Sequence, residues 1–350
     1  MRLRLGLGLR LRVLIQTLMP FPFNVFALAL LGAGLTTAAS VPFWRNWCRR
    51  NGVMDDPGER KLHSTPIPLA GGLAVMTGVM APVLAGALLT AGRTGLLRAL
   101  LNPSTARAFG HGFDKETVQL AAILAGAIGM LLIGLWDDKF ELRPAVKFSG
   151  QFLVALMVAS AGVRITLFVP SLWFHYGITI LWIVTVVNAF NFMDNMDGLC
   201  AGLGIIGGWC FGIISASQGQ FLVAAACFLI TGALAGFLPF NFPKAAVFLG
   251  DAGSHLTGYL MAVLAILPHF YTAKHPVKWA VLTPLLALAL PLGDLARVVL
   301  LRWKMGRPFY VGDTNHLSHY LARRGLSRTR AVLAIWLAAA ALGALACFLQ

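Results

Sequence analysis

The segment NAFNFMDNMDGL, residues 188–199, places polar side chains between two long apolar runs. Asn191, Asp194 and Asp197 follow one another at intervals of three, so they would share one face of a helix that continues the preceding run. Carboxylate and amide oxygens are hard ligands that suit Mg²⁺, which is usually held by one or two carboxylates together with substrate phosphates. The spacing therefore indicates a site for magnesium and phosphate. The simpler alternative is a polar turn that caps the next helix.

Four other polar clusters flank apolar runs. They are DDPGERKLHSTPIPLAGG at 55–72, GLWDDKFELRPAVKFSGQ at 134–151, FLGDAGSHLTGY at 248–259 and GRPFYVGDTNHLSHYLARRG at 306–325. The first contains Lys61, and the last contains His316 and His319. Two histidines spaced as HxxH are weak support for a metal site and could simply form a solvated helix face. The sequence lacks HExxH and GxSxG, so it does not indicate a zinc protease or a serine hydrolase.

Asp137 and Asp138 are adjacent acids at the end of an apolar run. Two like charges at a membrane edge need a nearby cation in order to stay ionised. Lys147 opens the next run, where a lysine could be functional or could simply extend to the interface. Asp251 lies between glycines at the start of a later run, where a helix would offer unpaired backbone N–H groups to an anion. The alternative for Asp251 is an N-cap, a position that Asp favours.

Membrane helices must position these clusters. The chain has 350 residues, of which 58% are hydrophobic and 12% are charged, whereas soluble domains are about 25% charged. Apolar runs of about 20 residues can cross the hydrocarbon core as helices. We find such runs centred near residues 31, 79, 127, 156, 182, 207, 230, 261, 288 and 340. The sequence therefore predicts an all-α polytopic membrane protein with ten transmembrane helices.

The domain organisation follows from this pattern. Residues 21–350 are predicted to form a single integral-membrane domain. The Arg-rich residues 1–20 are expected to form an interfacial segment, with part of an eleventh crossing as the alternative. The five cysteines contain no CxxC pair, so neither a zinc site nor a disulfide framework is indicated.

The distribution of charge predicts the orientation. The net charge is +15, and Lys and Arg are more numerous in the loops after the odd-numbered runs, which places those loops in the cytoplasm. All but two of the thirteen acidic residues, Asp114 and Glu116, lie on that same side. Acidic residues contribute little to topology, so their bias indicates an active site that faces the cytoplasm. The basic residues also suit an anionic membrane surface, and no aromatic and basic motif supports nucleic acid binding.

Together, the clusters resemble the polyprenyl-phosphate N-acetylhexosamine-1-phosphate transferases, the family of the phospho-MurNAc-pentapeptide translocase and the GlcNAc-1-phosphate transferases. The resemblance rests on DD, NxxNxxDxxDG, FxGDxGS and a late DxxHxxH, in the family's order from about Asp55 to Arg330. It implies a bacterial inner-membrane enzyme that transfers GlcNAc 1-phosphate, or a related sugar 1-phosphate, from a UDP-sugar to undecaprenyl or another polyprenyl phosphate. UMP would be released, and a cell-wall or surface polysaccharide would be started. The resemblance also implies Mg²⁺, with Mn²⁺ as an alternative ion, and leaves open whether the chain forms a homodimer.

The resemblance also implies roles for individual residues. Asn191 and Asp251 correspond to the metal ligands. Asp137 and Asp138 correspond to the essential acidic pair near the lipid phosphate, one of which would act as a base or as a covalent nucleophile. The residues implied to bind substrate are Lys61, Lys147, Asp194, Asn195, Asp197, Phe248, His316 and His319.

Within the substrate-binding set, the resemblance gives different residues different parts of the substrates. Asp194 and Asp197 correspond to acids on the nucleoside side, and Phe248 to an aromatic that stacks on uracil. Lys147 corresponds to a cation that neutralises phosphate. The loop with His316 corresponds to the one that contacts the sugar.

Two positions depart from the family pattern. The usual DGxDG reads DNMDG here, so Asn195 replaces a glycine beside the uracil pocket. Asn tolerates a positive φ better than most non-glycine residues, so the turn can survive this change. The late loop reads HLSH where relatives commonly have HxHH, so Ser318 replaces a histidine. The DxxHxxH form is closer to the GlcNAc-1-phosphate branch than to the pentapeptide branch.

Other functions stay open at this point. A secondary transporter would place charges near the bilayer midplane and show internal repeats, whereas these acids lie at the ends of the runs. A CDP-alcohol phosphatidyltransferase would carry a DGxxAR…GxxxDxxxD signature, which the sequence lacks. A noncatalytic relative is the third alternative. Phospho-MurNAc-pentapeptide transfer is the alternative reaction within the family.

Overall fold

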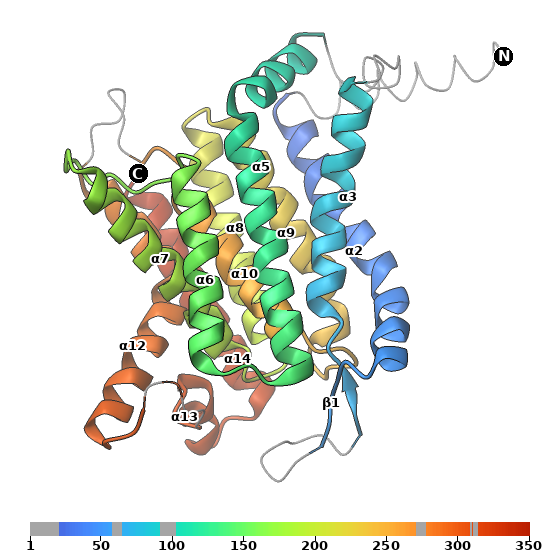
Figure 1. Ribbon diagram of the computed structural model, residues 1–350, viewed down its shortest axis with the longest axis vertical. Helices are drawn as coiled ribbons and strands as arrows, with labels where there is room; N and C mark the ends of the chain where they lie inside the picture. Colours follow the sequence, from blue (N-terminus) through green and yellow to red (C-terminus); the bar gives the residue numbers. More distant parts are fainter. Residues whose placement is uncertain (1–20, 58–64, 92–102, 271–277, 309, 311–313) are drawn as a thin grey trace, which may run out of the picture.

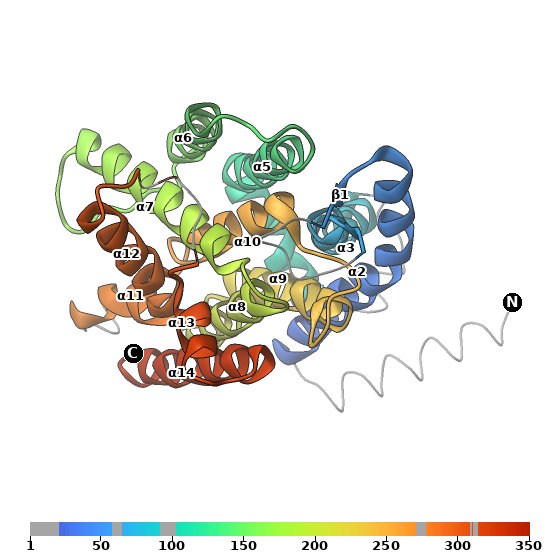
Figure 2. The ribbon, with the colours of Figure 1, turned by 90° about the horizontal axis from the view of Figure 1, so that it is seen from below.

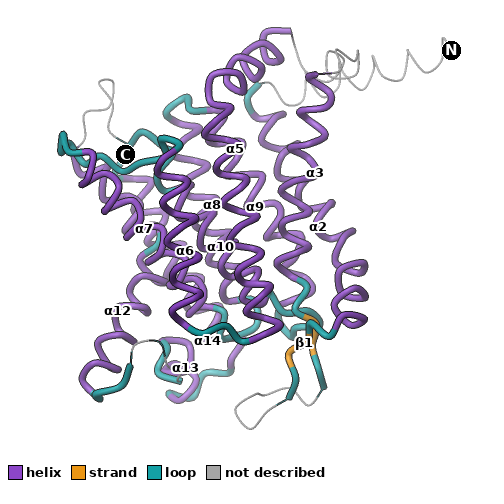
Figure 3. The backbone as a smooth tube through the Cα atoms, viewed as in Figure 1, coloured by secondary structure: helices purple, strands orange, loops and turns teal. Residues whose placement is uncertain are grey.

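The computed structural model describes residues 21–57, 65–91, 103–270, 278–308, 310 and 314–350 (Figure 1). Most of this backbone is helical, and the strands found in it are the two-residue β1 (Met54–Asp55) and β2 (Ile67–Pro68), which pair antiparallel. Figure 3 shows these strands at one end of a bundle of helices. The predicted all-α architecture is confirmed. The expectation for residues 1–20 lies outside the described part of the chain.

Nine of the ten positions that hydropathy predicted lie within helices, and the tenth, residue 288, lies at the break of a bent helical segment. The helices are α2 (Phe23–Asn51), α3 (Gly71–Ala91), α5 (Pro103–Phe140), α6 (Pro144–Ser160), α7 (Leu172–Met193), α8 (Leu199–Ser217), α9 (Phe221–Asn241), α10 (Gly250–Leu264) and α14 (Arg328–Phe348). The bent segment consists of η1 (Lys278–Leu282), α11 (Thr283–Ala287) and α12 (Ala289–Lys304). The short α13 (Leu317–Arg323) precedes α14.

Not all of these helices have the length of a membrane span. Within the described residues, seven are long and apolar enough to cross a membrane, and the bent segment, with an angle of 72° at its break, makes eight if it counts as one span. Helices α6 and α10 have only 17 and 15 residues. The structure therefore supports a polytopic membrane protein, while ten crossings stays a prediction.

Helix α10 lies in the middle of the bundle (Figure 2). All of its residues are buried except Asp251, and it contacts α3, α5, α7 and α8. Small residues allow this close packing, as is common between membrane helices. A Cβ added at Gly258 would collide with the backbone of Val187 in α7, and one added at Gly134 in α5 would collide with the backbone of Asp251. The position of Asp251 is therefore fixed by the packing around it.

The chain segments with the polar clusters meet at one end of the bundle, the lower end in Figure 1. Helices α5 and α7 end there, and α6 and α10 begin there, because neighbouring helices run in opposite directions. Helix α13 lies at the same end. Polar side chains that are far apart in the sequence are therefore brought to one face.

Candidate active site

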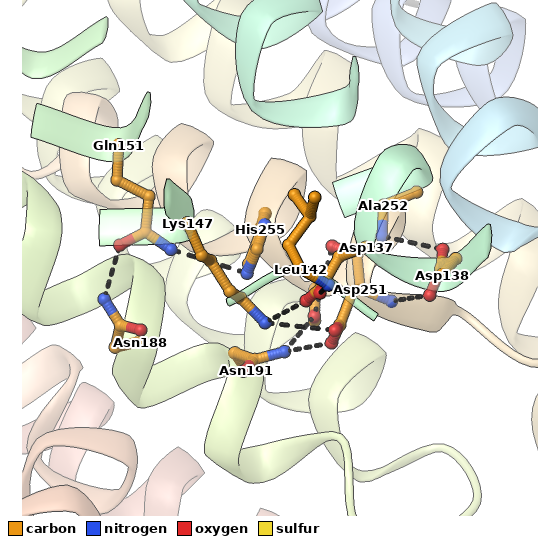
Figure 4. Close-up of polar contacts among 11 residues, drawn as sticks. Asp137, Asp138, Leu142, Lys147, Gln151, Asn188, Asn191, Asp251, Ala252 and His255 are labelled. Atoms are coloured by element: carbon orange, nitrogen blue, oxygen red, sulfur yellow. Dashed lines mark hydrogen bonds and ion pairs between the residues drawn. The ribbon is translucent and has the colours of Figure 1, made fainter. Parts of the chain in front are cut away.

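Lys147 joins two carboxylates that come from different helices (Figure 4). Its Nζ lies 2.5 Å from Oδ2 of Asp137, near the end of α5, and 3.0 Å from Oδ2 of Asp251 in α10. The side chains of Lys147 and Asp137 are only 16% and 9% exposed, whereas that of Asp251 is 33% exposed. Lys147 therefore places a positive charge next to Asp137, whereas its neighbour Asp138 does not share this ion pair. Asp251 is the carboxylate of this group that is most open to a ligand.

Asn191, in the last turn of α7, lies beside the same carboxylate. Its Nδ2 donates to Oδ1 of Asp251 at 2.5 Å and to Oγ of Ser254 at 2.9 Å. An amide next to a carboxylate offers the oxygen ligands that Mg²⁺ prefers, once the amide group turns its oxygen towards the ion. In the part of the chain that is described, no three His, Cys, Asp or Glu side chains are arranged to hold a metal. An ion at Asn191 and Asp251 would therefore also bind water and substrate phosphates.

Asp138 has a different environment from its neighbour Asp137. Its Oδ1 accepts a hydrogen bond from the backbone N of Asp251 at 2.7 Å, and its Oδ2 accepts one from the backbone N of Ala252 at 3.0 Å. A carboxylate at this position also interacts favourably with the positive end of the helix dipole. Two of the N–H groups that this helix start was expected to offer to an anion are therefore bound by the carboxylate of Asp138.

Gly250 makes this contact between Asp138 and α10 feasible. Its φ is +73°, a conformation that L side chains rarely adopt, and an added Cβ would lie 2.8 Å from Oδ2 of Asp138. The glycine is thus required both by the backbone conformation and by the closeness of the carboxylate.

The DNMDG segment forms a turn after α7. Helix α7 ends at Met193, Asp194 is its C-cap, and Gly198 has a φ of 76°. Nδ2 of Asn195 donates to the carbonyl oxygen of Phe192 at 2.5 Å, a local contact by which Asn competes with helix continuation. The prediction that the acids of this segment share a helix face with Asn191 is therefore wrong.

Both acids of the turn bind backbone amides from other segments. Asp194 accepts a hydrogen bond from the backbone of Gly250, and burial, followed by the charge of Asp251, raises the pKa of Asp194 to about 8. Oδ2 of Asp197 accepts from the backbone N of Ala245 at 3.0 Å. This bond connects the turn to the segment that leads to Phe248. Phe248 is half-buried and precedes Gly250 by two residues in the sequence.

Helix α13 contributes the predicted histidines. Nδ1 of His316, its N-cap residue, lies 2.7 Å from Oδ2 of Asp294 in α12, and Oδ1 of Asp294 accepts from the backbone N of Leu317 at 2.5 Å. His316 and Asp294 are both buried, and the His316 ring lies 6.3 Å from that of His319. Asp294 was not among the predicted site residues. The signal that could have found it is a lone acid inside an apolar run.

A second polar layer lies one helical turn deeper in the bundle. The first layer contains Lys147, Asn191 and Asp251. One helical turn from these residues lie, in the same order, Gln151 in α6, Asn188 in α7 and His255 in α10. Oε1 of Gln151 accepts from Nδ2 of Asn188 at 2.7 Å, and Nε2 of Gln151 lies 3.5 Å from Nε2 of His255. Sequence reasoning did not select these residues, although their spacing of three or four from the first layer was a signal.

Comparison with known proteins places these features in a family. The profile of glycosyl transferase family 4 matches residues 120–269. The "probable undecaprenyl-phosphate N-acetylglucosaminyl 1-phosphate transferase" of Bacillus subtilis strain 168 is 32% identical over 318 residues, which cover 89% of this chain and 81% of that protein. The chain belongs to glycosyl transferase family 4.

Other relatives agree with the family 4 assignment. The decaprenyl-phosphate N-acetylglucosaminephosphotransferase of Mycobacterium tuberculosis strain H37Rv is 32% identical over 347 residues, covering 90% of this chain and 80% of that protein. The undecaprenyl-phosphate alpha-N-acetylglucosaminyl 1-phosphate transferase of Escherichia coli strain K12 is 27% identical over 333 residues, covering 90% and 82%. As a family 4 member with several apolar spans, the chain is a multi-pass membrane transferase. This assignment argues against the transporter and the phosphatidyltransferase.

The structure connects most of the residues predicted from the family 4 resemblance. One connected set, joined by the contacts above, consists of Asp137, Asp138, Lys147, Asn191, Asp194 and Asp251. Asp197 and Phe248 lie on the segments next to it. The histidines lie on α13, which is joined to the turn because Ser318 Oγ donates to Asn195 Oδ1 at 2.5 Å. Lys61 lies outside the described residues.

Proposed function

We propose that this family 4 protein transfers GlcNAc 1-phosphate from UDP-GlcNAc to undecaprenyl phosphate or another polyprenyl phosphate. The names of the relatives in Bacillus subtilis, Mycobacterium tuberculosis and Escherichia coli all contain a polyprenyl phosphate and N-acetylglucosamine. The observation that carries the proposal is the contact of Lys147 with Asp137 and Asp251, beside Asn191, at one end of the bundle. This arrangement combines a cation with carboxylates at a place that a lipid phosphate can reach.

The reaction joins two anions. An oxygen of the lipid phosphate forms a bond to the β-phosphorus of UDP-GlcNAc, and the bond from that phosphorus to the bridging oxygen breaks, so UMP leaves with the bridging oxygen. Enzymes promote such transfers mainly by positioning the reactants and by neutralising charge. Lys147 has the charge and the position for this task. Mg²⁺, or Mn²⁺ in its place, would add positive charge at the pyrophosphate when it is bound by Asn191 and Asp251.

The geometry supports different roles for the two adjacent acids. Both oxygens of Asp138 accept backbone hydrogen bonds at the start of α10, so we assign Asp138 as a positioning residue for Asp251. Asp137 contacts Lys147 directly. We assign Asp137 as the base that takes a proton from the lipid phosphate, so that the attacking oxygen carries full charge.

The donor is assigned to the segments around the DNMDG turn. We assign uracil to the ring of Phe248 and the sugar to the side of α13 that carries His319. We also propose that this end of the bundle faces the cytoplasm of a bacterial inner membrane, because the loops on this side carry more Lys and Arg.

The test is release of UMP by the purified chain. The assay contains Mg²⁺, undecaprenyl phosphate and one of a panel of donors that includes UDP-GlcNAc, UDP-GalNAc and UDP-MurNAc-pentapeptide. The proposal predicts UMP only when lipid and UDP-GlcNAc are both present, together with a lipid-linked pyrophosphoryl GlcNAc detected by mass spectrometry. Release with the pentapeptide donor alone would assign the other branch of the family. No release with any donor, from folded protein, would support a noncatalytic relative.

A further inference from the structure

Ser318 and Asn195 join two elements of the site that are far apart in the sequence. Ser318 lies in α13 and is completely buried, with an exposed fraction of 0%. Its hydroxyl donates to Oδ1 of Asn195 at 2.5 Å, while Nδ2 of Asn195 donates to the carbonyl oxygen of Phe192. Both the oxygen and the nitrogen of the Asn195 side-chain amide are therefore hydrogen-bonded, and the amide connects the end of α7 to α13.

This connection adds to the other attachments of α13. Asp294 holds the start of α13 against α12 through His316 and the backbone of Leu317. The ring of His316 also packs edge-on against that of Phe192, with their centroids 5.4 Å apart. The Ser318 bond then ties α13 to the turn itself, next to the acid that accepts from Gly250 at the start of α10. The path from α10 through the turn to α13 thus passes through the Asn195 and Ser318 side chains.

The two side chains depend on each other for energetic reasons. A buried hydroxyl that loses its partner costs the full penalty of desolvation, whereas removing both partners together costs much less. In the sequence, Asn195 lies between Asp194 and Asp197, and Ser318 lies between His316 and His319, so the hydrogen bond of the pair joins these two groups. A loss of either side chain would let α13 shift relative to the turn.

We propose that Asn195 and Ser318 form a matched pair of positioning residues that fixes α13 against the DNMDG turn and thereby selects the sugar donor. This inference rests on the proposed function, in which the turn and α13 bind the two ends of the UDP-sugar. The pair contacts neither Lys147 nor Asp137, so it should leave the recognition of the lipid phosphate unchanged.

The test is a double-mutant cycle with Asn195→Ala, Ser318→Ala and the double variant. For each protein we would measure kcat, the KM for UDP-GlcNAc, the KM for undecaprenyl phosphate, the thermal midpoint, and the ratio of kcat/KM between UDP-GlcNAc and its C4 epimer UDP-GalNAc. Contacting residues give non-additive effects, so each single change should raise the donor KM about fivefold and the double change also about fivefold, in place of the roughly 25-fold expected for independent sites. The ratio of kcat/KM between UDP-GlcNAc and UDP-GalNAc should become smaller, and the KM for undecaprenyl phosphate should stay the same.

A matched control is Ser327→Ala. Ser327 is an exposed serine whose hydroxyl caps α14 by accepting from the backbone N of Arg330. It lies four residues after the end of α13, so its loss should lower the thermal midpoint slightly and leave the donor KM unchanged.

Several results would overturn the inference. Multiplicative effects on the donor KM would show that the two side chains act separately. A lower thermal midpoint with unchanged donor KM and unchanged epimer preference would show a bond that only stabilises the fold. If the wild-type chain releases no UMP, the proposed function fails, and the thermal shift caused by UDP-GlcNAc replaces KM in the same cycle. If the losses of that thermal shift in the single and double variants are non-additive, they would then support the pairing of Asn195 with Ser318. Additive losses would contradict it.

Discussion

Asp138 caps the helix that begins beside Asp251. Its carboxylate accepts the backbone N–H groups of Asp251 and Ala252, while the neighbouring Asp137 contacts Lys147. The DD motif therefore holds a structural acid and an acid that faces the site. This division of roles leads to the first prediction.

Asp138→Ala should destabilise the protein as well as inactivate it. Loss of an N-capping side chain costs about 0.5–2 kcal/mol of stability, and Asp251 would lose its fixed position. Asp137→Ala should abolish turnover with a smaller drop in the thermal midpoint measured in detergent, because Asp137 accepts one backbone hydrogen bond, from Leu142, where Asp138 accepts two. Equal midpoints for the two variants would contradict the assignment of Asp138 as the capping residue.

Lys147→Met should remove the charge that holds Asp137 and Asp251 together. Removing one preorganised donor from an active site lowers kcat by about 100-fold or more, and here the two carboxylates would also repel each other. Initial rates of UMP release at saturating substrates measure this effect. Lys147→Arg keeps the charge and should retain more activity than Lys147→Met, so similar rates for both would argue against charge neutralisation.

Gln151→Leu should lower stability through the second polar layer. It leaves the buried His255 ring without the amide that it faces and removes one of the two acceptors of the half-buried Asn188 amide, at a cost of about 1–3 kcal/mol for an unsatisfied group. Ser160→Ala, at the exposed end of the same helix, is the matched control. We expect a clear drop in the thermal midpoint for the first variant and little change for the second. The same midpoint for both would show that the layer contributes nothing.

Phe248→Ala should mainly weaken binding of the UDP-sugar. Stacking of a base on an aromatic ring is worth about 1–3 kcal/mol, so the donor KM should rise about tenfold while the lipid KM is unchanged. Phe248→Trp preserves an aromatic face and serves as the control. An unchanged donor KM for Phe248→Ala would show that uracil does not stack on Phe248.

Ser318→His should be harmful alone and better tolerated together with Asn195→Gly. Ser318 is buried against Asn195, so an imidazole would overpack the site, and overpacking costs about 1–3 kcal/mol. Removing the Asn195 side chain creates space for the ring. Donor kcat/KM of the single and double variants is the measurement, and a double variant that is no better than Ser318→His would contradict a shared packing site.

Local hydropathy was sufficient to predict the helices but not their geometry. Nine of the ten predicted centres lie within helices because an apolar run in lipid must satisfy its own backbone hydrogen bonds. The shortness of α10 was not predictable in the same way. The 15 residues of α10 lie in the middle of the bundle, in contact with α3, α5, α7 and α8. The bend of 72° between α11 and α12 likewise has no marker in the hydropathy pattern.

The residue types in the sequence indicated which residues form the candidate site, whereas the contacts between those residues could be identified only from the fold. The need of Asp137 and Asp138 for a cation could be argued from charge alone, whereas the contact of Lys147 with Asp137 and Asp251 could be seen only in the structure. The contact between Asn195 and Ser318 joins positions 123 residues apart, and a single sequence contains no signal for such a pairing. The helical continuation expected through Asp194 was wrong because the Asn195 side chain and the positive φ of Gly198 favour a turn.

In the proposed function, the group around Asp251 is the active centre of a polyprenyl-phosphate sugar transferase. The most direct measurement compares UMP release by the wild-type chain and by Asp251→Ala, with Mg²⁺, undecaprenyl phosphate and UDP-GlcNAc. We expect release by the wild type that requires both the lipid and the metal, and none by the variant, although the variant inserts into membranes normally. Normal release by Asp251→Ala would show that Asp251 is not part of the active centre.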